Sequence, residues 1–230
     1  MPVEHSPETK EFLRGLTITL DMDGVLAWSA VSVINKFNRM YNTKYFAWDI
    51  KGWDGITKLA EGLGEDPQIA FELETFLWYD PELLLAAPPM PGARALTRLL
   101  HESGAGFSII TSRKPNAGDI TFEWFRRWMP WINHEQIFIR RDENMSGEVF
   151  KAQTVAAREA NFHVDDSPRH AQFVLDYTQA NTNIFLLSNN PGELQYNPRV
   201  FAIKGFNAKF ANVSAVQKLL LSKTFSVAQY

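Results

Sequence analysis

The chain has 230 residues, of which 45% are apolar and 21% are charged, the balance of an ordinary globular protein with room for an α/β domain and a smaller insert. Its formal net charge of −3 argues against a nucleic-acid polymer bound through a basic face. It has no cysteine, which excludes disulfides, thiolate metal sites and a cysteine nucleophile and agrees with a cytoplasmic location. No apolar run is long enough to span a membrane, so we expect no membrane partner.

The first strand that the sequence predicts is followed directly by acids. Met1–Gly15 is polar and is expected to be a loose arm or a short helix, whereas Leu16–Leu20 is an apolar, β-branched run typical of a buried parallel strand. Asp21 and Asp23 come next, and Gly24 allows a sharp turn and a close approach of the backbone to an anion. On its own, this motif has a simpler alternative, an aspartate-rich turn that closes the strand.

A helical insert is expected after this motif. Ser29–Tyr41 carries apolar side chains at spacings of three, and shorter helical patterns follow at Ile56–Leu63 and Pro67–Trp78. We predict that residues 29–88 form a helical cap, bounded by a stiff proline-rich hinge at 87–92. Most aromatic side chains of the insert are expected to build its core, and one or two could stack on a flat ring in a cleft.

Strands and helices alternate beyond the hinge. We predict helices at Ala93–Ser103, Asp119–Trp128, Phe150–Ala160 and Pro168–Tyr177 and strands at Phe107–Ile110, Gln136–Arg140, Phe162–Val164 and Asn183–Leu187, the last being the final core strand. This alternation predicts a parallel sheet with right-handed crossovers. In the tail, an apolar pattern from Val213 to Leu220 predicts a helix that packs on the core or forms a dimer contact.

Four polar clusters lie just after predicted strands or open predicted helices. They are Asp21/Asp23, Thr111/Ser112, Lys151 and Asp165/Asp166. Because the carboxyl ends of parallel strands meet at one edge of a sheet, we expect the clusters to converge in one crevice.

This mixture of groups suits phosphoryl transfer. One carboxylate can attack phosphorus and carry it as an aspartyl-phosphate, and a second acid can move protons to and from the reacting oxygens. A hydroxyl and an ammonium can hold the phosphate oxygens. Clustered carboxylates would repel a phosphate dianion, so a hard cation such as Mg²⁺ is implied by electrostatics.

The same motifs resemble, in order, the four motifs of the haloacid dehalogenase (HAD) superfamily. They read Asp21-Met-Asp-Gly-Val, Ile110-Thr111-Ser112, Lys151 and Val164-Asp165-Asp166. The resemblance implies a Rossmannoid three-layer α/β core at 1–28 and 89–230, with a parallel sheet and with the cap at 29–88 as its insert. It also implies phosphatase or phosphotransferase chemistry rather than dehalogenation, because dehalogenases lack the second acid, Asp23.

A narrower resemblance is to the 5′(3′)-deoxyribonucleotidases of that superfamily. Besides the four motifs, it is carried by Gly52-Trp53, Pro91-Gly92-Ala93 and Arg141-Asp142. The sequence departs from that family at three places. Trp28 and Ser29 stand where the family has an acid and a base-stacking aromatic, and Glu143 replaces a lysine, so that Lys151 must supply the cation.

The resemblance implies a role for each matching residue. Asp21 would be the nucleophile and a metal ligand, and Asp23 the general acid/base, with its backbone carbonyl on the metal. Asp166 would be the direct acidic metal ligand, and Asp165 would bind a metal water or Lys151. The remaining expected site residues bind substrate, with Lys151 assisting: Gly24, Thr111, Ser112, Arg113 and Trp53.

Simpler readings compete with these roles. Thr111/Ser112 and Asp165/Asp166 could cap helices, and Lys151 could be a solvated helix lysine. Arg113, Lys114 and Arg141 are expected to be rim cations that touch phosphate or are merely solvated. The histidines show no ligand spacing, and His170 is expected on a helix surface.

The sequence therefore predicts a Mg²⁺-dependent phosphomonoesterase that acts through an aspartyl-phosphate. The expected substrate is a nucleoside monophosphate, preferably a deoxyribonucleotide, held by cap aromatics near Trp48, Trp53 or Trp78. The alternatives are a phosphatase of another small metabolite, such as a sugar phosphate, and a non-catalytic HAD-fold binding protein. The last is disfavoured because the acids and Lys151 are all present, and a homodimer is left open.

Overall fold

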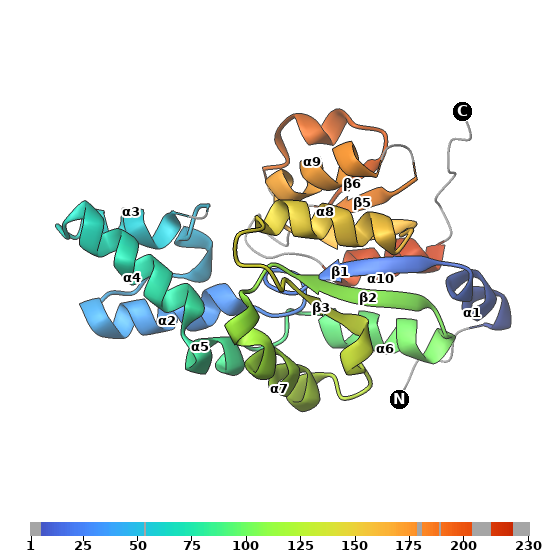
Figure 1. The fold of residues 1–230 in the computed structure, drawn as a ribbon, viewed down its shortest axis with the longest axis horizontal. Helices are drawn as coiled ribbons and strands as arrows, with labels where there is room; N and C mark the ends of the chain where they lie inside the picture. Colours follow the sequence, from blue (N-terminus) through green and yellow to red (C-terminus); the bar gives the residue numbers. More distant parts are fainter. Residues whose placement is uncertain (1–5, 53, 179–180, 189, 204–212, 223–230) are drawn as a thin grey trace.

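The computed structural model describes residues 6–52, 54–178, 181–188, 190–203 and 213–222, and these residues contain a six-stranded sheet in the order β3-β2-β1-β4-β5-β6 (Figure 1). Every adjacent pair of strands is parallel. The strands are β1 Thr17–Asp21, β2 Gly106–Thr111, β3 Ile137–Ile139, β4 Phe162–Asp165, β5 Asn183–Leu186 and β6 Val200–Ala202. The expected α/β fold with a parallel sheet is confirmed.

The strand order places one crevice at the centre of the sheet. From β1 the chain moves outward to β2 and β3, and it then returns to β4 on the other side of β1. Ligands of open α/β folds bind where the strand order reverses in this way, at the carboxyl ends of the strands. Asp21 ends β1 and Asp165 ends β4, so both acids stand at this reversal point.

Helices cover both faces of the sheet and make three layers (Figure 1). One face carries α6 Ala93–Ser103, α7 Gly118–Trp128 and α10 Val213–Ser222, and the other carries α8 Gly147–Ala157 and α9 Pro168–Tyr177. Successive strand residues point to opposite faces of the sheet. Ile18 and Leu20 pack in the hydrophobic cluster under α6, α7 and α10, and Ile110 and Ile184 pack in the cluster under α8 and α9. The amino-terminal helix α1 Pro7–Arg14 lies against α6.

The insert has a hydrophobic core of its own. Its helices are α2 Ser29–Tyr41, α3 Gly55–Gly62, α4 Pro67–Tyr79 and α5 Pro81–Ala86. Val33, Phe37, Ile56 and Leu77 belong to a cluster separate from the two sheet clusters. In Figure 1 these helices stand beyond the carboxyl ends of the strands, with α5 against α7. The division into a core and a cap at residues 29–88 stays a prediction.

Of two expectations about the carboxyl-terminal part, one needs correction and one is confirmed. Asn183–Leu187 is not the final core strand, because β6 pairs with β5; with only three residues, β6 is too short to show an alternating pattern in the sequence. The tail helix α10 packs on α6, which confirms core packing for Val213, Val216 and Leu220. Short 3₁₀ turns complete the description at Ala47–Asp49, Pro115–Ala117, His134–Gln136 and Gly192–Tyr196.

None of the helices within the described residues is long and apolar enough to cross a membrane.

The contact between α10 and the start of α6 can be tested with two glycines. A Cβ on Gly92, which has a φ of 87°, would overlap the Ser214 hydroxyl and lie 2.8 Å from its backbone nitrogen. Gly92→Ala should therefore lower the free energy of unfolding by about 1–3 kcal/mol. Gly62→Ala is the control, because that Cβ would meet nothing within 4 Å and alanine favours a helix. Equal effects of the two substitutions on urea denaturation would contradict the packing described.

Candidate active site

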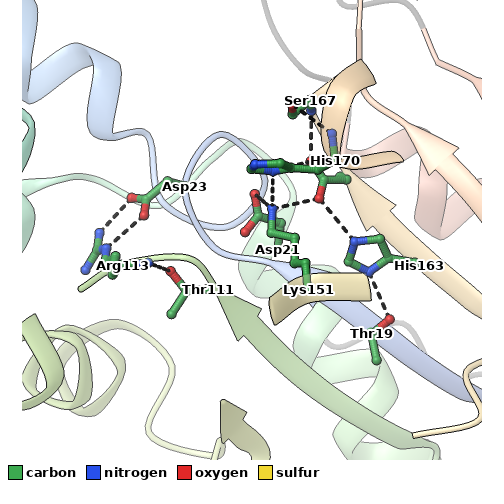
Figure 2. Close-up of polar contacts among 10 residues, drawn as sticks. Thr19, Asp21, Asp23, Thr111, Arg113, Lys151, His163, Ser167 and His170 are labelled. Carbon is green, nitrogen blue, oxygen red and sulfur yellow. Dashed lines mark hydrogen bonds and ion pairs between the residues drawn. The ribbon is translucent and has the colours of Figure 1, made fainter. Parts of the chain in front are cut away.

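A buried ammonium group lies at the centre of the crevice. Lys151 Nζ is 2.9 Å from Asp21 Oδ2, 2.7 Å from Asp165 Oδ2 and 2.7 Å from His170 Nδ1 (Figure 2). The lysine side chain is fully buried, and the two carboxylates are nearly so. The three contacts use the three N–H donors of the ammonium. Lys151 is thus joined to both acidic motifs, and the alternative of a solvated helix lysine is wrong.

The pleat of the sheet brings these groups together. Thr19 and Asp21 lie two residues apart on β1, and His163 and Asp165 lie two residues apart on β4, so each pair shares one face of its strand. The register sets Thr19 beside His163. Lys151 reaches the same face from α8, which covers it.

A second row of hydrogen bonds holds Asp165. Its Oδ2 is 3.1 Å from His163 Nε2, and Thr19 Oγ1 is 2.9 Å from the other ring nitrogen of that histidine. Burial lowers the pKa of His163 and favours the neutral ring. A neutral ring can donate from Nε2 to the carboxylate only if Nδ1 accepts the Thr19 hydroxyl, which fixes the tautomer.

The sequence interpretation missed both histidines. His170 was expected on a helix surface, and this is wrong: it lies in the first turn of α9, is buried, and accepts from the Lys151 ammonium through Nδ1. The sequence did hold a signal for His163. Its spacing of two from Asp165 on a strand predicts a shared face, just as for Thr19 and Asp21.

The carboxylates of the crevice have opposite pKa shifts. Burial disfavours ionisation of Asp165, but the charge of Lys151 and the hydrogen bond from His163 outweigh it and hold the pKa of Asp165 well below its usual range. Burial and the charges of Asp165 and Asp166 raise the pKa of Asp21 to about 7, although Lys151 acts against them. Burial and the charge of Asp165 likewise raise the pKa of Asp166 to about 7. One lysine therefore does not balance the negative charge here.

The group of residues that could hold a metal ion already contains one cation, the Lys151 ammonium. Ligand atoms of Asp21, Asp165 and His170 lie within 4.8 Å of one another, but Lys151 Nζ already stands among them as the cation. Both oxygens of Asp165 are also occupied, Oδ1 by the Ser167 backbone N–H at 2.8 Å. Of the two roles expected for Asp165, the geometry favours that of Lys151 partner, while its metal role stays a prediction.

The glycine of the first motif is required by the position of Asp166. Gly24 has a φ of 84°, and a Cβ there would overlap the Asp166 carboxylate. The two acidic motifs therefore meet at the bare Cα of Gly24, and the expected contact of Gly24 with phosphate stays a prediction.

The expected phosphate-binding hydroxyls lie at the end of β2. The Thr111 hydroxyl accepts the Arg113 backbone N–H at 3.3 Å, so its own proton remains for another acceptor. Ser112 lies against the first residue of α8, because a Cβ on Gly147 would be 2.7 Å from Ser112 Cβ. Ser146 caps this helix by accepting from the Val149 N–H at 3.3 Å. The positive end of the α8 dipole thus stands beside Ser112.

Asp23 lies apart from the lysine cluster and is held by Arg113 (Figure 2). Arg113 Nε is 2.8 Å from Asp23 Oδ2, and Nη2 is 2.7 Å from Oδ1. Burial opposes ionisation of Asp23, but the Arg113 guanidinium and the Ser29 hydroxyl outweigh it and lower the pKa of this carboxyl. Arg113 is buried, so the expectation of a solvated rim cation is wrong; its contact with substrate stays a prediction.

The other expected contacts are scattered over the cap and the rim. Trp53 lies outside the described residues. Trp48 stacks on Phe46 with ring centroids 4.4 Å apart, and Trp78 donates its indole N–H to the buried Glu74.

Two rim cations differ in their surroundings. Lys114 lies over the Tyr79 ring, 4.3 Å from its centroid, and so links the end of β2 to α4 of the insert. Arg141 is exposed, as a rim cation should be.

Comparison with known proteins identifies the family. A model of the family described as 5′ nucleotidase, deoxy (Pyrimidine), cytosolic type C protein matches residues 14–171, more than half of the chain. The chain belongs to this 5′-nucleotidase family. A search of curated proteins returns no match. The matched range contains both acidic motifs, Thr111, Lys151 and His170.

Several solved structures share this fold, and two of the three described here carry HAD or haloacid dehalogenase-like names. A HAD family hydrolase from Deinococcus radiodurans R1 with bound phosphate and sodium has a TM-score of 0.58 and 12% identity, covering 91% of this chain and 96% of that one. A predicted phosphatase from Clostridium acetobutylicum has a TM-score of 0.56 and 14% identity, with coverages of 90% and 98%. A haloacid dehalogenase-like hydrolase from Streptococcus pneumoniae has a TM-score of 0.52 and 14% identity, with coverages of 82% and 94%.

The family match makes the chain a phosphatase of the 5′-nucleotidase kind. The expected family resemblance and fold are confirmed, and the fold is one that HAD-family proteins also have.

The buried ammonium can be tested by its effect on stability. Lys151→Met would leave Asp165 buried without its counter-ion, which should cost about 3–5 kcal/mol in the free energy of unfolding. Lys58→Met is the matched control, because the Lys58 side chain is 63% exposed in a pair with Asp54 and should matter little. Urea denaturation of both variants measures the difference. Similar stabilities would show that Lys151 does not hold the acids.

The raised pKa values of Asp21 and Asp166 predict how stability varies with pH. Both values, about 7, lie above the unfolded value of 3.8, so the folded protein binds more protons than the unfolded chain between these limits. Without divalent cations, the melting temperature should fall as the pH rises from about 5.5 to 8. Asp166→Asn should flatten this slope. A melting temperature in EDTA that rises over this range would contradict the charge imbalance.

Proposed function

We propose that this 5′-nucleotidase hydrolyses nucleoside monophosphates through an aspartyl-phosphate on Asp21, with Mg²⁺ as cofactor. The observation that carries the proposal is the Asp21–Lys151–Asp165 assembly at the point where the strand order reverses. Asp21 has one oxygen fixed by the ammonium, and the hydroxyls and helix end suited to a phosphate stand at the neighbouring strand end, around Thr111 and Ser112.

The first half of the reaction breaks the ester bond. Asp21 attacks phosphorus as a carboxylate, and the bond from phosphorus to the ester oxygen breaks as the new bond forms. Asp23 gives its proton to the departing oxygen, which leaves as the nucleoside hydroxyl. The ammonium of Lys151 keeps the attacking side chain in place, and the Thr111 proton is free to bind a phosphate oxygen.

The second half releases phosphate. Asp23, now a carboxylate, takes a proton from water as the water oxygen attacks phosphorus, and the bond to Asp21 breaks. Asp21 then returns to its carboxylate form and Asp23 to its protonated form. The lowered pKa of Asp23 suits this second role, whereas the first role requires Asp23 to be protonated when the substrate is bound.

Asp21, Asp166 and the backbone carbonyl of Asp23 are the groups that would hold Mg²⁺. The donor set fits, because all are oxygen atoms and the two carboxylates have pKa values raised to about 7 for want of positive charge. The ion would supply the charge that lets a phosphate dianion approach this acidic crevice.

The substrate class is inferred from the family, whose description names deoxy and pyrimidine nucleotides. The helices at 29–88 stand over the crevice end of the sheet and would act as the cap that holds the nucleoside, with Trp48 as a candidate for base contact. A small phosphorylated partner and a cytoplasmic location complete the proposal. The second candidate is another small phosphate ester such as a sugar phosphate, since Trp28 and Ser29 replace the family's acid and base-stacking aromatic.

A panel of phosphate monoesters assayed with Mg²⁺ and with EDTA tests this proposal. Hydrolysis of deoxyribonucleoside monophosphates should require Mg²⁺, and Asp21→Asn should reduce it by at least about 10⁴-fold, since the variant lacks the nucleophile. Asp176→Asn, an exposed change on α9, is the control. A preference for sugar phosphates over every nucleotide would overturn the substrate class. Undiminished activity of Asp21→Asn would overturn the mechanism.

A further inference from the structure

We propose that Arg113 is a positioning residue for the proton-transferring carboxylate of Asp23, and that it does not bind the phosphate of the substrate. The inference rests on the proposed function, because it assigns Asp23 the two proton transfers of that reaction. Arg113 follows Thr111 and Ser112 in the sequence and was expected to bind substrate. The proposal instead makes it a support for the Asp23 carboxylate.

The first support is the geometry of the pair. Two donors on one side of the guanidinium meet the two oxygens of one carboxylate, at 2.8 Å and 2.7 Å. A planar fork that pairs in this way fixes both the plane and the rotation of the carboxylate, which a single lysine contact cannot do. Arg113 would have to give up Asp23 in order to grip a phosphate through the same donors.

The second support is the way in which Arg113 itself is held. Only 6% of the residue is exposed. Its Nη1 is 3.2 Å from Thr121 Oγ1 in α7, and that hydroxyl donates at 2.7 Å to the Ala117 carbonyl in the preceding turn. The guanidinium is therefore held on α7 through Nη1, while its Nε and Nη2 donate to Asp23.

The third support is the environment of Asp23. Ser29, the first residue of α2, also donates to Asp23 Oδ1, so this carboxylate joins the start of the insert to the core. The segment between them is closed by a Gly24 N–H to Ala27 carbonyl bond of 2.9 Å. The Asp23 side chain still has 30% of its surface exposed, unlike Arg113, so the acid and not the arginine is the member of the pair that solvent and substrate can reach.

This arrangement predicts which phosphate esters will be hydrolysed more slowly when Arg113 is replaced. Proton donation by Asp23 matters most when the departing oxygen is strongly basic, as in the alkyl ester of a nucleoside 5′-monophosphate. It matters little for 4-nitrophenyl phosphate, whose departing phenolate is stable without a proton. A residue that positions the acid should therefore affect the two esters unequally, whereas a phosphate ligand or a purely structural residue should affect them alike.

The test compares kcat/KM of wild type and Arg113→Met on these two esters in the presence of Mg²⁺. For the nucleotide that wild type hydrolyses best, kcat/KM should fall by up to about 10²-fold, the size of a typical general-acid contribution. The loss of orientation should outweigh the rise in the pKa of Asp23 that removal of the guanidinium also causes. For 4-nitrophenyl phosphate it should fall less than about fivefold, and inhibition by inorganic phosphate should be nearly unchanged. In an Asp23→Asn background, Arg113→Met should add no further discrimination between the esters.

Further variants keep the test informative if Arg113→Met folds poorly. Thr121→Val removes the anchor of the guanidinium and should give a smaller loss with the same preference for the nitrophenyl ester. Arg113→Lys should restore the nucleotide activity only in part, because one ammonium cannot replace the fork. Arg126→Met is the matched control, since its side chain is 75% exposed on α7, and it should change neither rate.

The outcomes separate the two proposals. Equal losses on both esters in Arg113→Met and Thr121→Val, or weakened inhibition by phosphate, would overturn the positioning role while leaving the proposed function intact. Failure of the wild-type protein to hydrolyse any phosphate ester would overturn the proposed function, and the positioning role with it.

Discussion

The contact on which the rest of this site depends is the buried Lys151 ammonium between Asp21 and Asp165. A fully buried cation is tolerated only when opposite charges and hydrogen bonds surround it, and here two carboxylates and His170 provide them. The same ammonium permits two acids to lie close together at the end of a sheet. It leaves excess negative charge, since the pKa values of Asp21 and Asp166 stay raised to about 7, and this excess supports the proposed binding of a divalent cation.

Much of this arrangement could be predicted from the sequence, because strand ends of a parallel sheet converge whatever the details of packing. Asp21, Thr111 and Asp165 end their strands as expected on that basis, whereas the role of Lys151 is expected only through the resemblance to the HAD motifs. The surroundings of Arg113 and His170 could not be predicted. A long side chain such as Arg113 can reach solvent, phosphate or Asp23 from the same backbone position, and only the Thr121 anchor selects among them. For His170, the exposed or buried face of α9 is decided by its packing on α8.

Asp21 and Asp23 are two residues apart and yet have different environments. The first belongs to the sheet and the lysine cluster, and the second belongs to the segment that leads into the insert, where Ser29 and Arg113 hold it. The proposed division of labour between nucleophile and proton carrier thus agrees with backbone position: Asp21 ends the strand, and Asp23 begins the segment that leads to the insert. In the proposed function, the insert holds the nucleoside, and the positions of its residues depend on its own hydrophobic core.

The most direct test of this account is to trap the covalent intermediate. The protein would be mixed rapidly with Mg²⁺ and its best substrate and quenched in acid, and its peptides would then be mapped by mass spectrometry. The account predicts one phosphoryl group, on the peptide that contains Asp21 and on that residue, with none in Asp21→Asn. A phosphoryl group on another residue, or turnover by Asp21→Asn at the wild-type rate, would contradict it.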